Sequence, residues 1–442
     1  MASPVITSLP ENAPPPVPEQ GLGVEFVGNR SALFWLALKS GFWTVLSLGF
    51  YRFWMKTRLR RWYWSSIRPG GHSLEYVGDP WEKLLGFFIA VVILTFYIGI
   101  VNLLLMFVSF SVFQSSFVGY FASFLGVIPI WFYAQYRARR YVLGRTRWRG
   151  VRFGLEPGAW GYAWRALVHW VITICTAGVL WPRMTFWLEK YKTDRTFFGS
   201  AKLVQSGRWQ MLIPAAMPFA VAVFVSGGLG VWMIYLDPLV PQTGAPLDDL
   251  LRSMGAASDL GFIPFGWNAP WRLFALIPAV LLLIYGAVHY RFVSKRILAN
   301  HKHAQGVRMR SALNGLRVSM IYALGTTIAY LMLLFGIVGI VGVAFALMGP
   351  DAFLEAQIGT GDPLGDLPQW LSIAIVALLY LSVFLVWSVL HHVFVTYPLM
   401  RHMALTFSLV DVAGLSLVSQ RARDEFAEAE GFAEALDLGA AI

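Results

Sequence analysis

Residues 50–68, FYRFWMKTRLRRWYWSSIR, contain six Lys or Arg and five Trp or Tyr side chains but no acidic residue. We call this stretch the basic aromatic segment. An apolar run precedes it, and no Asp, Glu, Lys or Arg occurs from Leu84 to Tyr136. In membrane proteins Lys and Arg stay on the cytoplasmic side, while Trp and Tyr lie at headgroup level. The pattern predicts an integral membrane protein with this segment at the cytoplasmic face, and it indicates no activity.

The composition of the whole chain agrees with this prediction. Of 442 residues, 57% are hydrophobic and 13% are charged, whereas an ordinary soluble domain has about 25% charged residues. The net charge is +11, but the basic residues cluster in short segments beside apolar runs. This clustering favours the lipid bilayer and its anionic headgroups as partners and argues against nucleic acid. Cys175 is the single cysteine, which excludes an intrachain disulfide.

Six apolar runs are long enough to cross a bilayer, which takes about 20 residues of helix. They are Leu84–Val112, Phe117–Tyr136, Met211–Tyr235, Arg272–Tyr290, Val318–Met348 and Trp370–Val395. Two further runs are ambiguous because each contains a cation. Ser31–Tyr51 contains Lys39, and Tyr162–Pro182 contains Arg165.

The charges of the loops decide how the ambiguous runs are interpreted. The basic segments 52–83, 137–152, 183–208 and 291–310 are all expected on the cytoplasmic side. A full crossing by Tyr162–Pro182 would place every later loop on the side opposite to the one its charge favours. We therefore expect an all-α integral membrane protein with six transmembrane helices, two re-entrant or interfacial helices and cytoplasmic termini. The alternative is eight spans.

Each ambiguous run has a predicted break, at Ser47-Leu48-Gly49 and at Thr176-Ala177-Gly178. Irregular backbone at membrane depth is tolerated where protein covers it. The six spans are therefore expected to pack around these two elements.

The chain also contains weak internal repeats. Similar units open at Val24-Glu25-Phe26, Gly150-Val151-Arg152-Phe153 and Gly306-Val307-Arg308-Met309. Duplicated membrane units occur in transporters and also in proteins that transport nothing. We divide the chain into a disordered Pro-rich arm (1–23), membrane repeat unit 1 (24–149), membrane repeat unit 2 (150–305), membrane unit 3 (306–400) and a cytoplasmic C-terminal tail with an amphipathic helix (401–442).

The first unit resembles the YjgN-like family of bacterial inner-membrane proteins, a domain of unknown function. The resemblance rests on Val24-Glu25-Phe26-Val27-Gly28, Ser47-Leu48-Gly49-Phe50-Tyr51, Phe53-Trp54, Arg58, Arg60-Arg61-Trp62-Tyr63 and Tyr76-Val77-Gly78. Thr176-Ala177-Gly178-Val179-Leu180-Trp181-Pro182-Arg183 is similar to the family's internal echo of the same motif. The tail residues 430–437 also resemble the family's ending, whereas the middle of unit three departs from its pattern. The resemblance implies a bacterial inner membrane and brings no activity with it.

Candidate binding residues are cations. Lys39 and Arg165, within the ambiguous helices, are candidate contacts for an anionic substrate or lipid headgroup; the alternative is snorkelling at the interface. Arg58, Arg60 and Arg61 are further candidate anion or lipid contacts, and the alternative for their segment is an interfacial anchor helix. No acid, base and nucleophile constellation is present, so we expect no enzyme, no catalytic residue, no metal site and no cofactor.

Two functional hypotheses follow. A transporter or channel for a small solute or lipid would explain the repeats and the ambiguous helices. A membrane scaffold or assembly factor that binds anionic lipid and protein partners would explain the absence of carboxylates from the six spans. Its protein partner would dock on the C-terminal tail, where Val418, Ala422, Phe426, Ala429, Ala433 and Leu436 form one apolar face. The first hypothesis is favoured; substrate and oligomeric state do not follow from the sequence.

Overall fold

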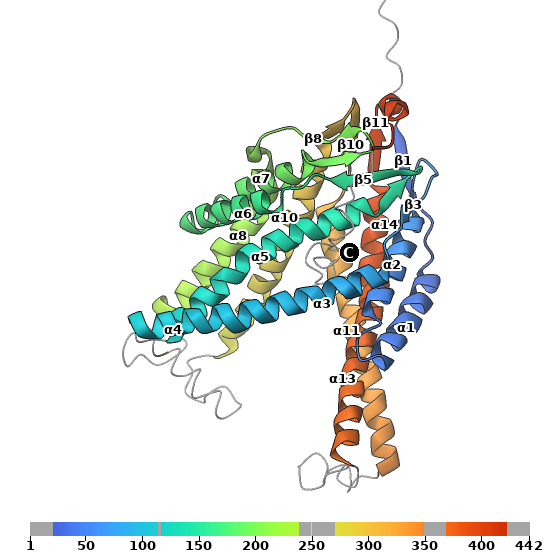
Figure 1. The fold of residues 1–442 in the computed structure, drawn as a ribbon. Coiled ribbons are helices and arrows are strands. Elements are labelled where there is room, and N and C mark those ends of the chain that lie inside the picture. The colour runs from blue at the N-terminus through green and yellow to red at the C-terminus, as the bar shows by residue number, and fades with distance from the viewer. Residues whose placement is uncertain (1–20, 114–115, 238–248, 250–269, 349–367, 422–442) are drawn as a thin grey trace, which may run out of the picture.

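The computed structural model describes residues 21–113, 116–237, 249, 270–348 and 368–421. Helices make up most of this part, but it also contains eleven short strands in two sheets. The prediction of an all-α fold is therefore wrong. Figure 1 shows the strands gathered at one end of the molecule, with the long helices reaching away from it. The predicted arm up to residue 20 and the predicted amphipathic tail helix from residue 422 onward lie outside the described residues.

The strands follow the order of the chain and all pair antiparallel. One sheet has the order β2-β1-β11-β10-β9-β8 and the other β3-β4-β5-β6-β7. β2 lies beside β3, and Leu203 alone separates β7 from β8, so the two sheets continue one into the other. The strands are β1 (Leu22–Phe26), β2 (Ile67–Pro69), β3 (Leu74–Tyr76), β4 (Thr146–Trp148), β5 (Val151–Leu155), β6 (Thr196–Phe198), β7 (Ala201–Lys202), β8 (Val204–Gln205), β9 (Lys302–Ala304), β10 (Val307–Ser311) and β11 (Phe407–Val410).

All three predicted unit openings lie at strands, namely β1, β5 and β10. Arg149 and Gly150, between β4 and β5, have φ angles of 51° and 79°. Gln305 and Gly306, between β9 and β10, have φ angles of 46° and 85°. Two consecutive positive φ angles are typical of the two-residue type I′ hairpin turn, which favours glycine. The glycine at the start of the second and third openings therefore closes a β-hairpin.

Every predicted apolar run is helical. The α-helices that form or adjoin these runs are α3 (Pro80–Phe96), α4 (Asn102–Phe113), α5 (Ser116–Gly144), α8 (Ile213–Val231), α10 (Leu276–Asn300), α11 (Gly315–Met348), α13 (Gln369–His391) and α14 (Tyr397–Leu405). Short 3₁₀ or π-helical segments adjoin them: η1 (Tyr97–Val101), η2 (Trp209–Leu212), η3 (Trp232–Leu236), η4 (Pro270–Ala275) and η5 (His392–Thr396). A last short segment, η6 (Val412–Leu417), follows the last strand. Among the described residues, four helices are long and apolar enough to cross a membrane: Trp209–Leu236, Arg272–Asn300, Gly315–Gly339 and Tyr380–Leu405. These helices are consistent with a membrane protein, and the count of six spans stays a prediction.

Each ambiguous run forms the first helix of a helix pair, and the chain reverses at the predicted break. The pairs are α1 (Arg30–Leu46) with α2 (Arg52–Ser66), and α6 (Ala159–Cys175) with α7 (Trp181–Thr193). Leu48 and Gly49 have φ angles of 52° and 96° between the first two helices, and Ala177 and Gly178 have 47° and 85° between the second two. In each turn the glycine N–H donates to a threonine carbonyl five residues earlier, at 2.7 and 2.8 Å. Such left-handed bonded turns end a helix and favour glycine.

We call the helices that lie between two paired strands a helical excursion. Each helical excursion begins after one strand of an antiparallel pair and ends before the other. Phe26 lies opposite Ile67, for example, so α1 leaves β1 and α2 returns to β2 beside it. The pair β3/β4 encloses α3 to α5, β5/β6 encloses α6 and α7, β8/β9 encloses α8 to α10, and β10/β11 encloses α11 to α14. Because paired strands lie side by side, both ends of every excursion lie at the same end of the molecule.

The basic aromatic segment contributes to the core. It forms α2 and β2, and its residues Met55, Leu59 and Tyr63 are buried in a cluster that also contains Leu33 of α1 and Val389 of α13. The Tyr63 hydroxyl donates to the carbonyl oxygen of His392 at 3.4 Å. The apolar positions of α2 therefore fix the membrane-directed helices to the strand end, whereas its cations are distributed around them.

Candidate functional site

An amphipathic cavity of about 750 Å³ lies among α5, the α6–α7 pair, the α8–α10 pair and β9. We call it the cationic cavity because five of its lining residues are Lys or Arg and, among the described residues that line it, one is acidic. The cations are Arg139, Lys192, Arg291, Lys295 and Lys302, and the acidic residue is Glu189. The site therefore has a surplus of positive charge.

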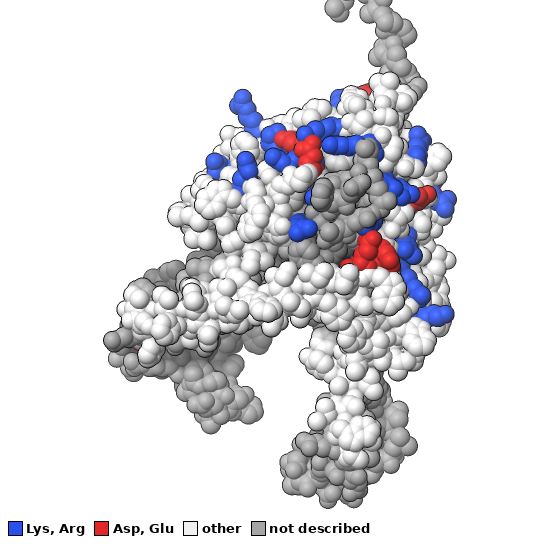
Figure 2. Space-filling model, in the orientation of Figure 1, with Lys and Arg blue, Asp and Glu red and all other residues white. Residues whose placement is uncertain are grey.

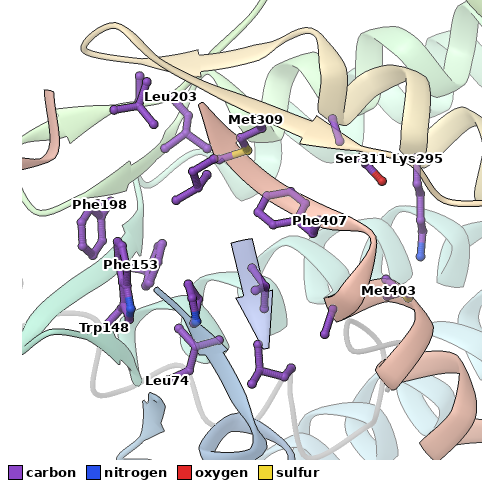
Figure 3. A pocket seen from close by; sticks show the side chains of 18 of the residues that line it. Leu74, Trp148, Phe153, Phe198, Leu203, Lys295, Met309, Ser311, Met403 and Phe407 are labelled. Atoms are coloured by element: carbon purple, nitrogen blue, oxygen red, sulfur yellow. The ribbon is translucent and has the colours of Figure 1, made fainter. Parts of the chain in front are cut away.

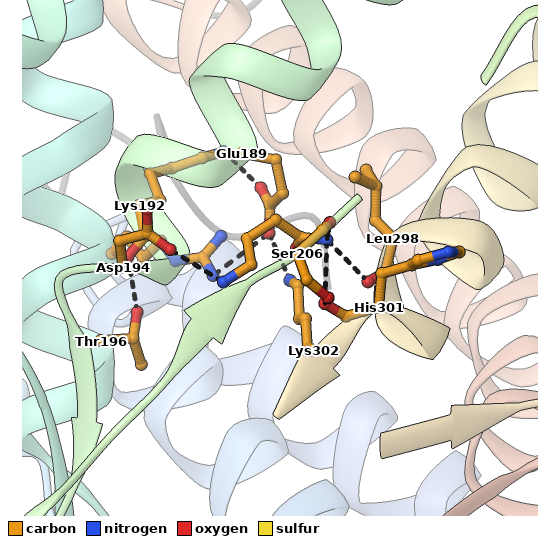
Figure 4. Close-up of polar contacts among 10 residues, drawn as sticks. Glu189, Lys192, Asp194, Thr196, Ser206, Leu298, His301 and Lys302 are labelled. Atoms are coloured by element: carbon orange, nitrogen blue, oxygen red, sulfur yellow. Dashed lines mark hydrogen bonds and ion pairs between the residues drawn. The ribbon is translucent and has the colours of Figure 1, made fainter. Parts of the chain in front are cut away.

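Glu189, on α7, is shared by three of these cations (Figure 4). Its Oε1 accepts a hydrogen bond from Lys302 Nζ at 2.8 Å, and its Oε2 lies 3.0 Å from Lys192 Nζ. Arg139 Nη2 approaches Oε1 to 3.6 Å. The Glu189 side chain is 19% exposed and that of Lys302 15%, so the ion pairs are partly shielded from water and are less screened than surface pairs.

The direction of the pKa shifts in this cluster indicates whether Glu189 is charged at neutral pH. Burial alone would raise the pKa of Glu189, but the nearby Lys192, Lys302 and Arg139 hold it well below its usual value. Burial lowers the pKa of Lys302, and Glu189 opposes that shift. Glu189 is therefore ionised at neutral pH. Neither Arg291 nor Lys295 forms an ion pair with another residue in the described part of the chain, so part of the positive charge is uncompensated.

The β8–β9 pair holds α7 in place against the end of α10. The side chain of Gln205, on β8, is buried, and its Nε2 donates to the Leu298 carbonyl at 3.1 Å. Lys190, on the last turn of α7, donates to the Gln205 carbonyl, and Asp194, the residue after α7, accepts from the Gln205 N–H, both at 2.8 Å. Figure 4 shows the neighbouring bond from the Ser206 hydroxyl to the His301 carbonyl, 2.9 Å long. The charged cluster is thus positioned by strand pairing and not by long loops.

The remaining wall of the cationic cavity is largely apolar and aromatic. Tyr162, Trp181, Leu188 and Phe219 line it, and the rings of Trp181 and Phe219 lie 6.2 Å apart across the α7–α8 junction. Ligand sites commonly combine apolar walls with a few fixed polar groups. Here the polar groups are mostly cationic, so the arrangement suits an amphiphile with an anionic group.

The structure does not bring the two intramembrane candidates Lys39 and Arg165 together. Both side chains are exposed, on α1 and α6 respectively, and Figure 1 places these helices on opposite sides of the molecule. Arg165 donates to the Gly161 carbonyl at 3.0 Å, and its guanidinium lies 4.7 Å from the centre of the Tyr191 ring. A role for either cation at a lipid headgroup stays a prediction.

The three candidate arginines of the basic aromatic segment, Arg58, Arg60 and Arg61, have different environments. Arg60 is buried, 5.2 Å from the centre of the Tyr76 ring. Arg61 is exposed on one side and donates to the Gly78 carbonyl at 2.9 Å. Arg58 is exposed and stacks over Tyr51 at 5.5 Å. Of the three, Arg58 and Arg61 are exposed, and lipid contact by this segment remains a prediction.

The residues of the cationic cavity were not singled out from the sequence. Lys192 and Lys302 fall within the predicted basic segments 183–208 and 291–310, which were interpreted as topological signals. The sequence feature that could have pointed to this site is Glu189, an acidic residue within the otherwise cationic stretch 183–192, which also contains Trp187. Among the described residues, no group of three or more His, Cys, Asp or Glu could hold a metal ion.

Comparisons with known proteins identify a family. The sequence model of a bacterial protein family of unknown function, DUF898, matches residues 22–334. No curated protein and no solved structure matches the chain. The match spans more than half of the chain and includes all the residues that line the cationic cavity. The chain therefore belongs to DUF898, the YjgN-like family of bacterial proteins of unknown function that its first unit resembles.

Proposed function

We propose that this chain is a multi-pass protein of the bacterial inner membrane with its strand end in the cytoplasm. Basic residues support this orientation, because Lys and Arg favour the cytoplasmic side. In Figure 2 they gather around the strand end, whereas the two projecting lobes show neither blue nor red on that face. In this arrangement the excursions α3–α5, α8–α10 and α11–α14 cross and return, giving six spans. The pairs α1–α2 and α6–α7 dip into the bilayer from the cytoplasmic side.

The dipping helix pairs are supported by their exposed aromatic residues. Trp35 and Trp43 on α1 are 63% and 45% exposed, and Trp160 and Trp164 on α6 are 66% and 68% exposed. Tryptophan at such positions favours the headgroup region of a membrane. The apolar turn between α6 and α7 exposes Val179 to 76%. Lipid is the environment in which these faces are stable, since apolar surface in water is costly.

An origin of these two helix pairs by internal duplication is supported by a shared detail. In the first pair the Thr44 hydroxyl lies 3.7 Å from the sulfur of Met55, and in the second the Thr173 hydroxyl lies 3.9 Å from the sulfur of Met184. In both cases the two residues are eleven positions apart and span the left-handed turn. Lys39 precedes Thr44 by five residues and Arg165 precedes Thr173 by eight, so these two cations are not equivalent positions.

The function that the geometry supports best is the binding and transfer of an anionic membrane lipid. One observation carries this proposal: an amphipathic cavity with five cations and one carboxylate lies where membrane-directed helices meet the strand end. A phosphate headgroup would pair with Arg291, which forms no ion pair with the described residues, because charge-assisted hydrogen bonds are the strong ones. Trp181 and Phe219 would contact the lipid's apolar part. A lipid is thereby favoured over a small solute, which would need no apolar wall.

The experiment compares lipid retention by full-length variants purified in mild detergent. In the test variant Lys192 and Arg291 are changed to Met and Gln; in the control Lys202 and Arg208, exposed cations outside the cavity, are changed in the same way. We expect mass spectrometry to find several-fold less phosphatidylglycerol on the test variant than on the control, with phosphatidylethanolamine unchanged. Equal phosphatidylglycerol on both variants would contradict the proposal. Transfer itself is then tested by movement of labelled phosphatidylglycerol between leaflets of vesicles containing the wild-type protein.

A further inference from the structure

The strands surround a second cavity, of about 450 Å³, which is separate in character from the cationic cavity. We call it the strand cavity. Residues of both sheets line it, including Val24 of β1, Phe153 of β5 and Phe407 of β11. Its position inside the succession of strands follows from their order, because β1 pairs with β11 and the two sheets meet at β2–β3 and at β7–β8. Figure 3 shows side chains from several strands facing this space.

The lining of the strand cavity is apolar at one side and cationic at the other. Trp148, Phe153 and Phe198 form one side, and Lys295 and Ser311 lie opposite them (Figure 3). Arg296 adjoins Lys295 on α10 and donates to the Leu313 carbonyl at 3.2 Å. Among the described residues, Lys295 and Arg296 are the charged side chains that line this cavity.

A space of this size and polarity favours an apolar occupant over water. A volume of 450 Å³ corresponds to about fifteen waters at roughly 30 Å³ each, and buried waters need polar partners that apolar walls do not supply. Small-molecule sites typically have volumes of about 300–1,000 Å³ and are lined by apolar residues with a few polar ones. The strand cavity lies within this range of volumes and has this kind of lining.

We propose that the strand cavity binds an acyl chain whose anionic head pairs with Lys295. The chain lies among the aromatic residues of β4, β5 and β6. The carboxylate or phosphate lies at the α10 side, where the Lys295 ammonium makes no ion pair with the described residues and sits 5.1 Å from the Phe292 ring centre. The acyl chain belongs either to a free fatty acid or to a membrane phospholipid. Lys295 lines both cavities, but this site goes beyond the proposed headgroup function, because β9 is the strand of its lining that also contributes to the cationic cavity.

The test uses full-length protein in detergent and a palmitate analogue with a diazirine in its chain. After illumination, peptide mapping should place the label on residues 146–155 and 196–203. Two variants introduce the same aromatic side chain into neighbouring strands: Ala201→Phe, buried and facing the strand cavity, and Val204→Phe, which is 42% exposed and outside it. We expect Ala201→Phe to lose at least four-fifths of the label and Val204→Phe to keep it. Labelling that is unchanged in Ala201→Phe would overturn the proposal.

A second measurement keeps the proposal testable if Ala201→Phe does not fold. Displacement of the labelled palmitate by unlabelled palmitate is compared with displacement by its uncharged methyl ester. In wild-type protein the acid should compete about ten-fold better, as expected for one charge-assisted contact, and in Lys295→Met the two should compete equally. If Lys295→Met still prefers palmitate over its methyl ester, the proposed pairing between the ligand's anionic head and Lys295 is refuted. Better competition by palmitate than by phosphatidylglycerol assigns a free fatty acid, and the reverse assigns a phospholipid chain.

The outcome is independent of the proposed headgroup function. The variant with Lys192→Met and Arg291→Gln leaves every lining residue of the strand cavity intact, so it should keep the label on residues 146–155 and 196–203. Loss of phosphatidylglycerol with retention of this label would separate the two sites. Loss of both in that variant would refute a distinct strand-cavity site.

Discussion

Replacement of Glu189 by Gln tests the charged cluster most directly. The change keeps the size of the side chain but removes the negative charge that three cations share at 2.8, 3.0 and 3.6 Å. Removing one partner of a buried ion pair costs about 3–5 kcal/mol, while exposed pairs contribute about 0.2–1 kcal/mol. The Glu189 side chain is 19% exposed, so we expect a loss of about 2–3 kcal/mol between these limits.

The assay is thermal unfolding of the purified protein in a neutral detergent, with Glu156→Gln as the matched control. Glu156 pairs with Lys202 at 2.8 Å, but these side chains are 30% and 54% exposed, so its loss should cost less than about 1 kcal/mol. Added phosphatidylglycerol should restore the Tm of Glu189→Gln more than phosphatidylcholine does, because its headgroup has a net negative charge that replaces the missing carboxylate, whereas the headgroup of phosphatidylcholine is neutral overall. Equal Tm values for the two variants, or equal rescue by both lipids, would refute this reasoning.

Three further predictions follow from the same structure. The pKa of Glu189 is lowered in the folded protein, so its stabilising contribution is complete above the unfolded value of about 4.3 and is lost as the pH falls through the lower folded value. The Tm difference between wild type and Glu189→Gln should therefore be constant from about pH 7 to about pH 5 and shrink below about pH 4. A reporter active only in the periplasm should be silent after Lys202 and active within residues 248–259; activity after Lys202 would exclude the dipping arrangement of α6 and α7. Gly178→Ala, at φ 85°, should lower the stability by about 1 kcal/mol, whereas Gly227→Ala within α8, where a Cβ meets open space, should leave the Tm unchanged or higher.

The long helices and their breaks could be predicted because their signals are local. A run such as Met211–Tyr235 contains enough consecutive apolar residues to specify a helix by itself, and Ala177-Gly178 contains the glycine that a left-handed turn needs. The strands were missed because most have only two to five residues, too few for an alternating pattern to stand out. Thr146–Trp148 also lies in a segment whose arginines had already been explained by topology.

The cationic cavity could not be predicted because its residues come from distant parts of the chain. Glu189 and Lys302 are 113 positions apart, and they meet because β8 pairs with β9. Without the strands, no sequence argument connects the two. Lys39 was a candidate because a lysine within an apolar membrane helix is costly. In the structure it is exposed on α1, on the opposite side of the molecule from Arg165, so the two cations do not form one site.

The pairing of the first strand with the last has a consequence for biosynthesis. Leu22 of β1 lies opposite Leu409 of β11, so β1 lacks this partner until nearly the whole chain has been made. At about 5–20 residues per second, synthesis of the intervening chain takes roughly 20–80 s. In the proposed membrane arrangement the helices are synthesised during that interval, before β1 can pair with β11. Until then one edge of β1 is open to other chains, a known hazard for aggregation, so the last of the described strands completes the pairing of the first.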